Sequence, residues 1–137
     1  SICFGINALG IMAGSLLTTY FPKVEKALST GVSGFLLMSI LVAATLLSGS
    51  SVYAVETALF LLLVCMGMIL PTTTALALEP VRENSGYASA VLGFMAFLAG
   101  GICSPLAGLG NMLITTSVII LICAVSTLLL TIRKRTA

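Results

Sequence analysis

Several residue types on which enzymes depend are missing from this sequence. It contains no histidine and no aspartate among its 137 residues. The run Gly31-Val32-Ser33-Gly34 has the pattern found around the serine nucleophile of some intramembrane proteases. Such a serine needs an adjacent base, and without histidine that pair cannot form. The absence of aspartate excludes aspartyl proteases as well, so the sequence predicts a protein that is not an enzyme.

Metal, cofactor and nucleic-acid sites also lack their usual sequence signals. The four cysteines (Cys3, Cys65, Cys103 and Cys123) all lie inside apolar runs and form no C-x-x-C pair. This pattern predicts small buried hydrophobic residues and not a disulfide framework or a metal site. The sequence contains no phosphate-binding or dinucleotide-binding glycine motif and no basic patch interleaved with aromatics. We expect no metal, no cofactor and no nucleic-acid partner.

Charge is scarce, and apolar residues fill the space it leaves. Hydrophobic residues make up 59% of the chain and charged residues 7%, whereas a soluble domain carries about 25% charged residues. The mean hydropathy is +1.23. A helix needs about 20 apolar residues to cross the hydrocarbon of a bilayer, and helices are the default spanning structure. The composition therefore predicts an all-α membrane protein surrounded by a lipid bilayer.

The charge-free runs give the number of crossings. The last run, 84–132, is 49 residues long and must hold two helices, which the breaker-rich segment 108–111 separates. Five transmembrane helices are predicted, at about 2–20, 31–49, 56–78, 86–107 and 112–132.

The basic residues predict the orientation of these spans. All six follow the first, third or fifth span, at Lys23, Lys26, Arg82 and 133–135. By the positive-inside rule these segments and the C-terminus are cytoplasmic, and residue 1 is outside. An odd number of spans that starts outside suggests a piece of a longer chain. A complete small protein with a translocated N-terminus is the alternative.

Small residues recur at helical spacing in the first and fourth spans. Gly10 and Gly14 are four residues apart in the first. In the fourth, Ser85, Ser89 and Gly93 are four apart, and a second series with the same spacing follows at Ala96, Gly100, Ser104 and Gly108. Such stripes let helix backbones approach closely in lipid. They predict either a helix that rocks against a partner or tight static packing. The spans at 31–49 and 112–132, which are rich in Leu, Ile, Val and Thr, are expected to face lipid.

The third span is interrupted by a proline. Pro71 removes one backbone donor and crowds the carbonyl of Gly67, which favours a kink. The threonines at 72–74 can bond freed backbone groups. The kink has a functional interpretation, as part of a transport path, and a purely structural one. The same two interpretations apply to Pro105 in the fourth span.

Only two polar side chains stand out at membrane depth outside these motifs. Asn7 lies inside the first span and is expected to face protein or water. Glu56 begins the third span, where an acid at the membrane surface is the favoured interpretation, although ionisable residues in membranes are functional candidates.

At this point the sequence resembles a known family. The segments 85–93 (SGYASAVLG), 100–106 (GGICSPL) and 4–10 (FGINALG) resemble the last spans of a major facilitator superfamily transporter. Within that family they are most similar to drug exporters of the bicyclomycin-resistance (Bcr/CflA) type. Two features depart from the pattern: the loop after the first span keeps only Lys23 and Lys26 of a longer basic motif, and the middle of the fourth span, 94–97, is wholly apolar.

The resemblance implies that the chain is spans eight to twelve, most of the C-terminal half of a twelve-helix transporter in a bacterial inner membrane. It implies export of drugs or other small amphipathic molecules by alternating access, coupled to proton entry. The partners would be the missing N-terminal half, a small-molecule substrate and protons. Candidate substrate contacts, chosen as polar or aromatic groups on the presumed cavity helices, are Asn7, Met66, Phe94 and Phe97. A membrane anchor or assembly subunit, and a sugar or metabolite transporter of the same fold, remain alternatives.

Overall fold

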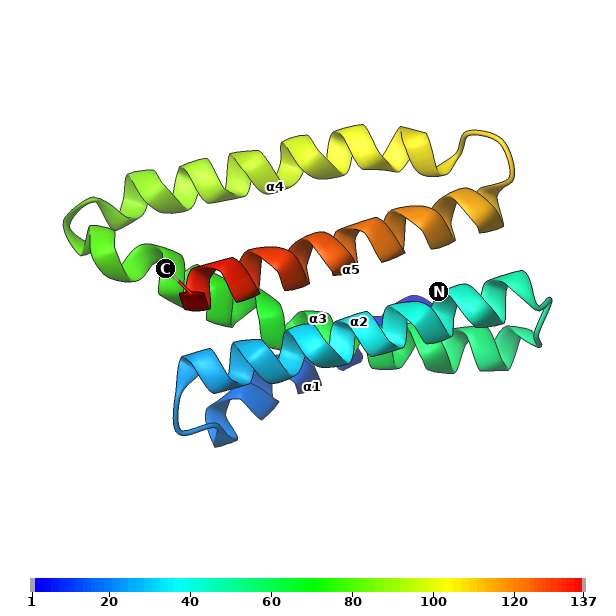
Figure 1. The fold of residues 1–137 in the computed structure, drawn as a ribbon, viewed down its shortest axis with the longest axis horizontal. Helices are drawn as coiled ribbons and strands as arrows, with labels where there is room; N and C mark the ends of the chain where they lie inside the picture. Colours follow the sequence, from blue (N-terminus) through cyan, green and yellow to red (C-terminus); the bar gives the residue numbers. More distant parts are fainter. Residues whose placement is uncertain (1, 137) are drawn as a thin grey trace.

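The computed structural model describes the backbone of residues 2–136 and the side chains of residues 2–133. The described chain is built from helices joined by short turns (Figure 1). In chain order they are α1 (Ile2–Leu17), η1 (Thr18–Tyr20), α2 (Val24–Leu47), α3 (Val52–Leu78), η2 (Glu79–Asn84), α4 (Ser85–Ala107) and α5 (Met112–Thr136).

By length and hydropathy, four helical segments within the described residues could cross a membrane. They are Ile2–Tyr20, Val24–Leu47, Val52–Ala107 and Met112–Arg133. The count is one below the five predicted spans because the third segment, 56 residues long, contains α3, η2 and α4 without a break. Within η2 the backbone of Val81 leaves the helical region, with φ −122° and ψ 37°. There the chain reverses, so that α4 runs back in the opposite direction to α3 (Figure 1).

Helix α3 is the centre of the packed part of the molecule. It packs against α1 and against α2, and α2 in turn packs against α5. Val42 of α2 with Ala58 and Leu62 of α3 form a buried apolar cluster. Because α2 lies between two neighbours, it carries seven buried residues, although Leu37 on its other side is 62% exposed. The helix expected to face lipid therefore leaves only one side exposed in the described residues.

Helix α4 differs from the other α-helices because none of its residues is buried. It lies beside α5 and apart from the α1–α3 pair (Figure 1), and its few contacts are with η2, α3 and α5. The described residues thus offer no helix that covers the apolar surface of α4.

The turns follow from local chemistry. Gly49 (φ 63°) and Gly110 (φ 72°) adopt left-handed backbone conformations in the turns after α2 and α4, which glycine enters without steric cost. Asn111 precedes α5 and caps its start: its Oδ1 accepts a hydrogen bond from the backbone N–H of Leu113 at 3.2 Å. The oxygen of Leu109 accepts another from Thr115 Oγ1 at 2.8 Å.

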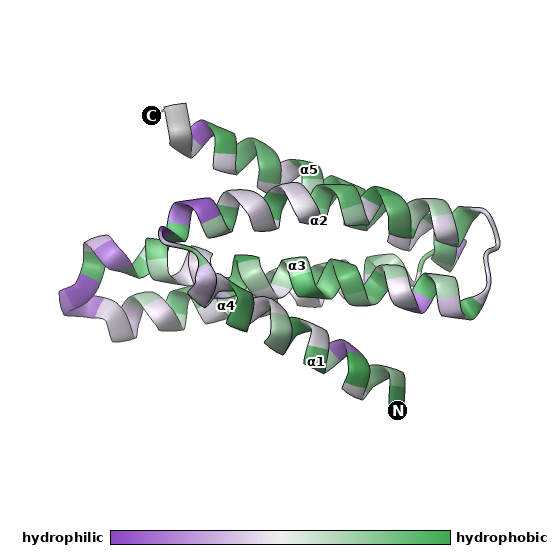
Figure 2. Cartoon of the chain, turned by 90° about the horizontal axis from the view of Figure 1, so that it is seen from below, coloured by the Kyte–Doolittle hydropathy of each residue, from purple (hydrophilic) through white to green (hydrophobic). Residues whose placement is uncertain are grey.

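Helices α2 and α5 extend beyond their predicted spans at the ends that carry charged residues, because a helix can continue outside lipid. Helix α2 begins at Val24, seven residues before the predicted start, and has Glu25 in its first turn, where an acid suits the helix dipole. Three hydrophilic segments lie at the same end of the molecule (Figure 2). They are the beginning of α2, the whole of η2 and the last turn of α5. We call this the basic end and the other the opposite end.

Candidate functional site

Glycines bring the backbones of α1 and α3 into close contact. A Cβ added at Gly14 would collide with the backbone carbonyl of Val64, and one added at Gly67 would collide with that of Ile11. The same Gly14 Cβ would lie 3.1 Å from the Cα of Gly67. Backbones approach this closely only where small residues face each other, and in lipid that contact is a main source of helix association.

The contacts also fix how the two helices are aligned. Gly10 faces Phe60, whose ring carbons would lie 3.1 Å from an added Cβ, and Gly14 faces Val64. Residue numbers therefore rise together along both helices, which run in the same direction. One turn nearer the opposite end, Asn7 precedes Gly10 by three residues and Glu56 precedes Phe60 by four. Because side chains three or four residues apart share a helix face, Asn7 lies on the same face of α1 as Gly10, and Glu56 lies on the same face of α3 as Phe60.

Glu56 differs from the surface acid that the sequence favoured. It is the fifth residue of α3 and half-buried. Its Oε1 is buried and has no hydrogen-bond partner, and the same holds for Oδ1 of Asn7. A polar atom in this situation costs free energy, so each one calls for an explanation. Asn7, half-buried on the face of α1 that carries Gly10 and Gly14, does face protein, as expected.

A groove runs along the α1–α3 interface toward the basic end. Its volume is about 570 Å³, within the range of small-molecule sites. Its lining is mostly apolar and comes from Ile11, Ser15, Gly67, Leu70, Pro71, Thr74, Ala75 and Leu78. The groove therefore suits an apolar or amphipathic molecule better than a charged one.

Pro71 lines this groove, and α3 continues past the proline as far as Leu78. Proline leaves the carbonyl of Gly67 without its usual donor. The hydroxyls of Thr72, Thr73 and Thr74 instead donate to the carbonyls of the residues four before them, at 2.7, 2.7 and 2.8 Å. The threonine hydroxyls thus find acceptors within their own helix. None of them bonds the Gly67 carbonyl, the group that the proline leaves without its usual donor.

The structure does not gather the four predicted substrate contacts into one site. Asn7 lies in the α1–α3 interface, whereas Met66 (38% exposed) is on an open side of α3. Phe94 and Phe97 project from α4 and are 65% and 85% exposed. None of the four lines the groove.

The small residues of α4 are likewise not packed against another helix in the described part of the chain. Nothing lies within 4 Å of a Cβ added at Gly93 or Gly100, and Ser89 bonds only its own helix, donating to the carbonyl of Ser85 at 2.7 Å. Pro105 lies in the last turn of α4 and is exposed. The packing expected of this stripe stays a prediction, since no described helix covers it.

Sequence reasoning missed the role of small residues in α2. Gly31 faces Met68 of α3, with 3.1 Å between the added Cβ and the Met68 Cβ, and Gly34 faces Cys65. These glycines belong to the segment first considered as a protease motif. Ala27, which is 1% exposed, precedes Gly31 by four residues. That spacing is the signal that could have identified the face.

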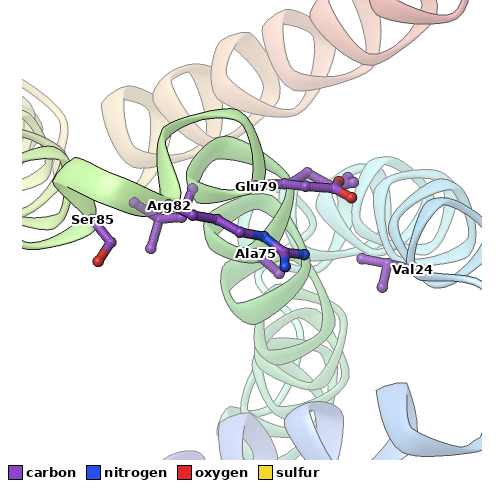
Figure 3. Close-up of a pocket in the computed structure, with 7 residues that line it drawn as sticks. Val24, Ala75, Glu79, Arg82 and Ser85 are labelled. Carbon is purple, nitrogen blue, oxygen red and sulfur yellow. The ribbon is translucent and has the colours of Figure 1, made fainter.

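A second pocket lies at the basic end, where α2 begins and α3 ends (Figure 3). Its volume is about 370 Å³, and Val24, Ala75, Glu79, Arg82 and Ser85 contribute to its lining. The Arg82 and Glu79 side chains both extend toward the side on which Val24 lies, and Arg82 passes Ala75 on the way (Figure 3). This pocket is open and more polar than the groove.

Comparison with known proteins gives the family context. No family model and no solved structure matches the chain. Over 115 residues, 81% of its length, the chain is 34% identical to YdgK of Bacillus subtilis strain 168, described as an uncharacterised MFS-type transporter. The match spans 28% of that relative's length. The relative's family consists of transporters and not of enzymes, which agrees with the prediction that this chain is not an enzyme. This similarity supports membership of the chain in the major facilitator superfamily.

Proposed function

We propose that the chain forms part of a secondary transporter that moves small molecules across a membrane by alternating access. The observation that carries the proposal is the 34% identity to an MFS-type transporter over 81% of the chain. The helices support it, because they are long and apolar enough to cross a bilayer. In this proposal α3 and α4 cross separately, giving five transmembrane helices that make up most of a C-terminal half.

The proposed orientation puts the basic end in the cytoplasm. Lys23, Lys26, Arg82 and Arg133 belong to the segments that meet at this end (Figure 2), and basic residues favour the cytoplasmic side. The start of α1 then faces outward and the end of α5 inward. The membrane proposed is the bacterial inner membrane, in keeping with the bacterial relative.

The proposed cargo is a drug or another small amphipathic molecule, exported in exchange for protons as in Bcr/CflA-type exporters. The apolar lining of the α1–α3 groove supports an apolar cargo. Met66, Phe94 and Phe97 are exposed on α3 and α4. They would contact substrate in a cavity that the remaining part of the transporter completes.

Ethidium export from cells that carry the complete protein tests this proposal. We expect Phe97→Ala to lower the export rate several-fold, because Phe97 is 85% exposed on a proposed cavity helix. Leu129→Ala is the matched control, since Leu129 is 61% exposed on α5, which is proposed to face lipid. If the wild-type protein confers no export of ethidium or of other amphipathic drugs, drug export is wrong. A sugar or metabolite transporter of the same fold is then the alternative.

A non-transporting anchor or assembly subunit is the second candidate, and the uncovered surface of α4 is the observation that favours it. The two candidate functions predict different access of water to the thiols of Cys65 and Cys103, which are both partly buried. In a transporter, a membrane-impermeant thiol reagent should label at least one of them when substrate or pH changes. An anchor should show no change in labelling under any of these conditions.

A further inference from the structure

The groove along α1 and α3 adjoins the pocket at the basic end, because Ala75 and Leu78 line both of them. The groove has a volume of about 570 Å³ and a mostly apolar lining. The pocket has a volume of about 370 Å³, and charged side chains take part in its lining. Together they form a hollow that is apolar along α3 and charged where it reaches the basic end.

The length of the groove matches one leaflet of a bilayer. Its lining on α3 runs from Gly67 to Leu78, which is roughly 16 Å at 1.5 Å per residue. The hydrocarbon of a bilayer is about 30 Å thick, so each leaflet supplies about half of that thickness. An extended acyl chain of one leaflet would therefore fill the groove from the basic end toward the middle of the membrane.

The pocket at the basic end is lined by one acid and one base. Glu79 and Arg82 both belong to η2, and both extend toward the side on which Val24 lies (Figure 3). Within the described part of the chain, no ion pair or hydrogen bond joins these two side chains to each other. Each charge can therefore meet a ligand group of the opposite sign.

We infer that the groove and the pocket bind a phospholipid whose headgroup carries both a phosphate and an ammonium. One acyl chain lies in the groove against Ile11 and Leu70, which line it. The Arg82 guanidinium donates hydrogen bonds to the phosphate, and the ammonium donates to the Glu79 carboxylate. Hydrogen bonds between groups of opposite charge are the strong ones. The site does not depend on which substrate the transporter moves.

Three other occupants fit this hollow less well. An apolar helix from the rest of the transporter, or an apolar cargo, would fill the groove but leave both charges of the pocket without a partner. An anionic lipid such as phosphatidylglycerol would pair with Arg82 and offer no positive group to Glu79. Only a zwitterionic lipid meets the length, the apolar lining and both charges together.

Photo-crosslinking of the complete protein tests the site. The probe is phosphatidylethanolamine with a photoreactive diazirine in one acyl chain, added to the purified protein in detergent. Mass spectrometry of the digested protein should find the adducts on residues 67–78 and 11–15, which line the groove. Excess unlabelled phosphatidylethanolamine should remove these adducts, whereas the same excess of ethidium should not.

Substitutions then separate the acyl-chain groove from the headgroup pocket. Ala75→Trp should remove most of the adducts, because its ring would fill the place where groove and pocket meet. Ala90→Trp, at an exposed position of α4, is the control and should keep them. Arg82→Gln should raise the concentration of phosphatidylethanolamine that halves the adducts by about fivefold, the effect of roughly one basic residue at a membrane surface.

The acid of the pocket distinguishes the two headgroups. Glu79→Gln should weaken competition by phosphatidylethanolamine and leave that by phosphatidylglycerol unchanged, because the second lipid has no ammonium. Glu83→Gln is the matched control, since Glu83 is an exposed acid of η2 outside the lining of the pocket. It should change neither competition.

The inference is wrong if the adducts fall on α5 as often as on α1 and α3, or if Arg82→Gln leaves the competition unchanged. Removal of the adducts by ethidium would make the groove a drug site and not a lipid site. Equal effects of Glu79→Gln on both lipids would reject the zwitterionic headgroup. If Ala75→Trp does not fold, Arg82→Gln decides the outcome. A failed ethidium export assay with intact adducts would reject drug export and leave the lipid site standing.

Discussion

Replacing Gly14 by alanine is the sharpest test of the α1–α3 interface. The added methyl group would collide with the carbonyl of Val64 and lie 3.1 Å from the Cα of Gly67. Both are backbone atoms, so no side chain can rotate away to make room. Helix α1 has to move off α3, and the contacts along the interface loosen with it.

The expected cost follows from what this displacement disturbs. Forcing an extra methyl group into a packed contact costs about 1–3 kcal/mol. Alanine favours a helix over glycine by up to about 1 kcal/mol in water. Gly5→Ala isolates this second effect, because nothing lies within 4 Å of a Cβ at that position on the same helix. Relative to Gly5→Ala, we expect Gly14→Ala to lower the free energy of unfolding by about 1–3 kcal/mol.

Unfolding of the complete protein by SDS in mixed micelles, followed by circular dichroism, measures this difference. Both variants must insert in the membrane to the same level as the wild type for the comparison to hold. Equal unfolding free energies for the two variants would refute the reasoning, and so would a Gly14→Ala protein more stable than Gly5→Ala. Either result would mean that α1 and α3 do not meet through these glycines.

Two further substitutions test other helices. Ser39→Leu should lower the free energy of unfolding by about 1–3 kcal/mol in the same assay, because Ser39 is fully buried in α2. Ser126→Leu is the control and should leave the free energy of unfolding unchanged, because Ser126 is exposed on α5. Gly93→Leu should abolish ethidium export and leave insertion intact. Unchanged export in this variant would contradict a packing stripe on α4.

Glycines that recur at helical spacing in the sequence have different surroundings in the structure. Gly10 and Gly14 are buried against α3, whereas nothing lies within 4 Å of a Cβ added at Gly93 or Gly100. The spacing could predict a smooth face but not which partner covers it. In water a buried face is marked by apolar residues, but in lipid the exposed faces are apolar as well. Periodicity therefore carries little information about burial in this chain.

Asn7 and Glu56 show the same limit. The sequence identified each residue as polar at membrane depth but treated the two separately, and it favoured a surface role for Glu56. Only the tertiary structure shows that one side-chain oxygen of each is buried without a hydrogen-bond partner. The burial depends on how the helices pack, as at the close contacts of Gly10, Gly14 and Gly67, which no local pattern specifies.

The sequence alone determined the helical, membrane-spanning class and the approximate helix ends. Lipid offers backbone groups no partner except one another, so a long apolar run must become a helix wherever it falls. The tertiary structure decided which helices touch, where the groove lies between α1 and α3, and which polar atoms are left unpaired. Those outcomes depend on backbone contacts between distant segments, where a difference of one methyl group decides whether two helices can meet.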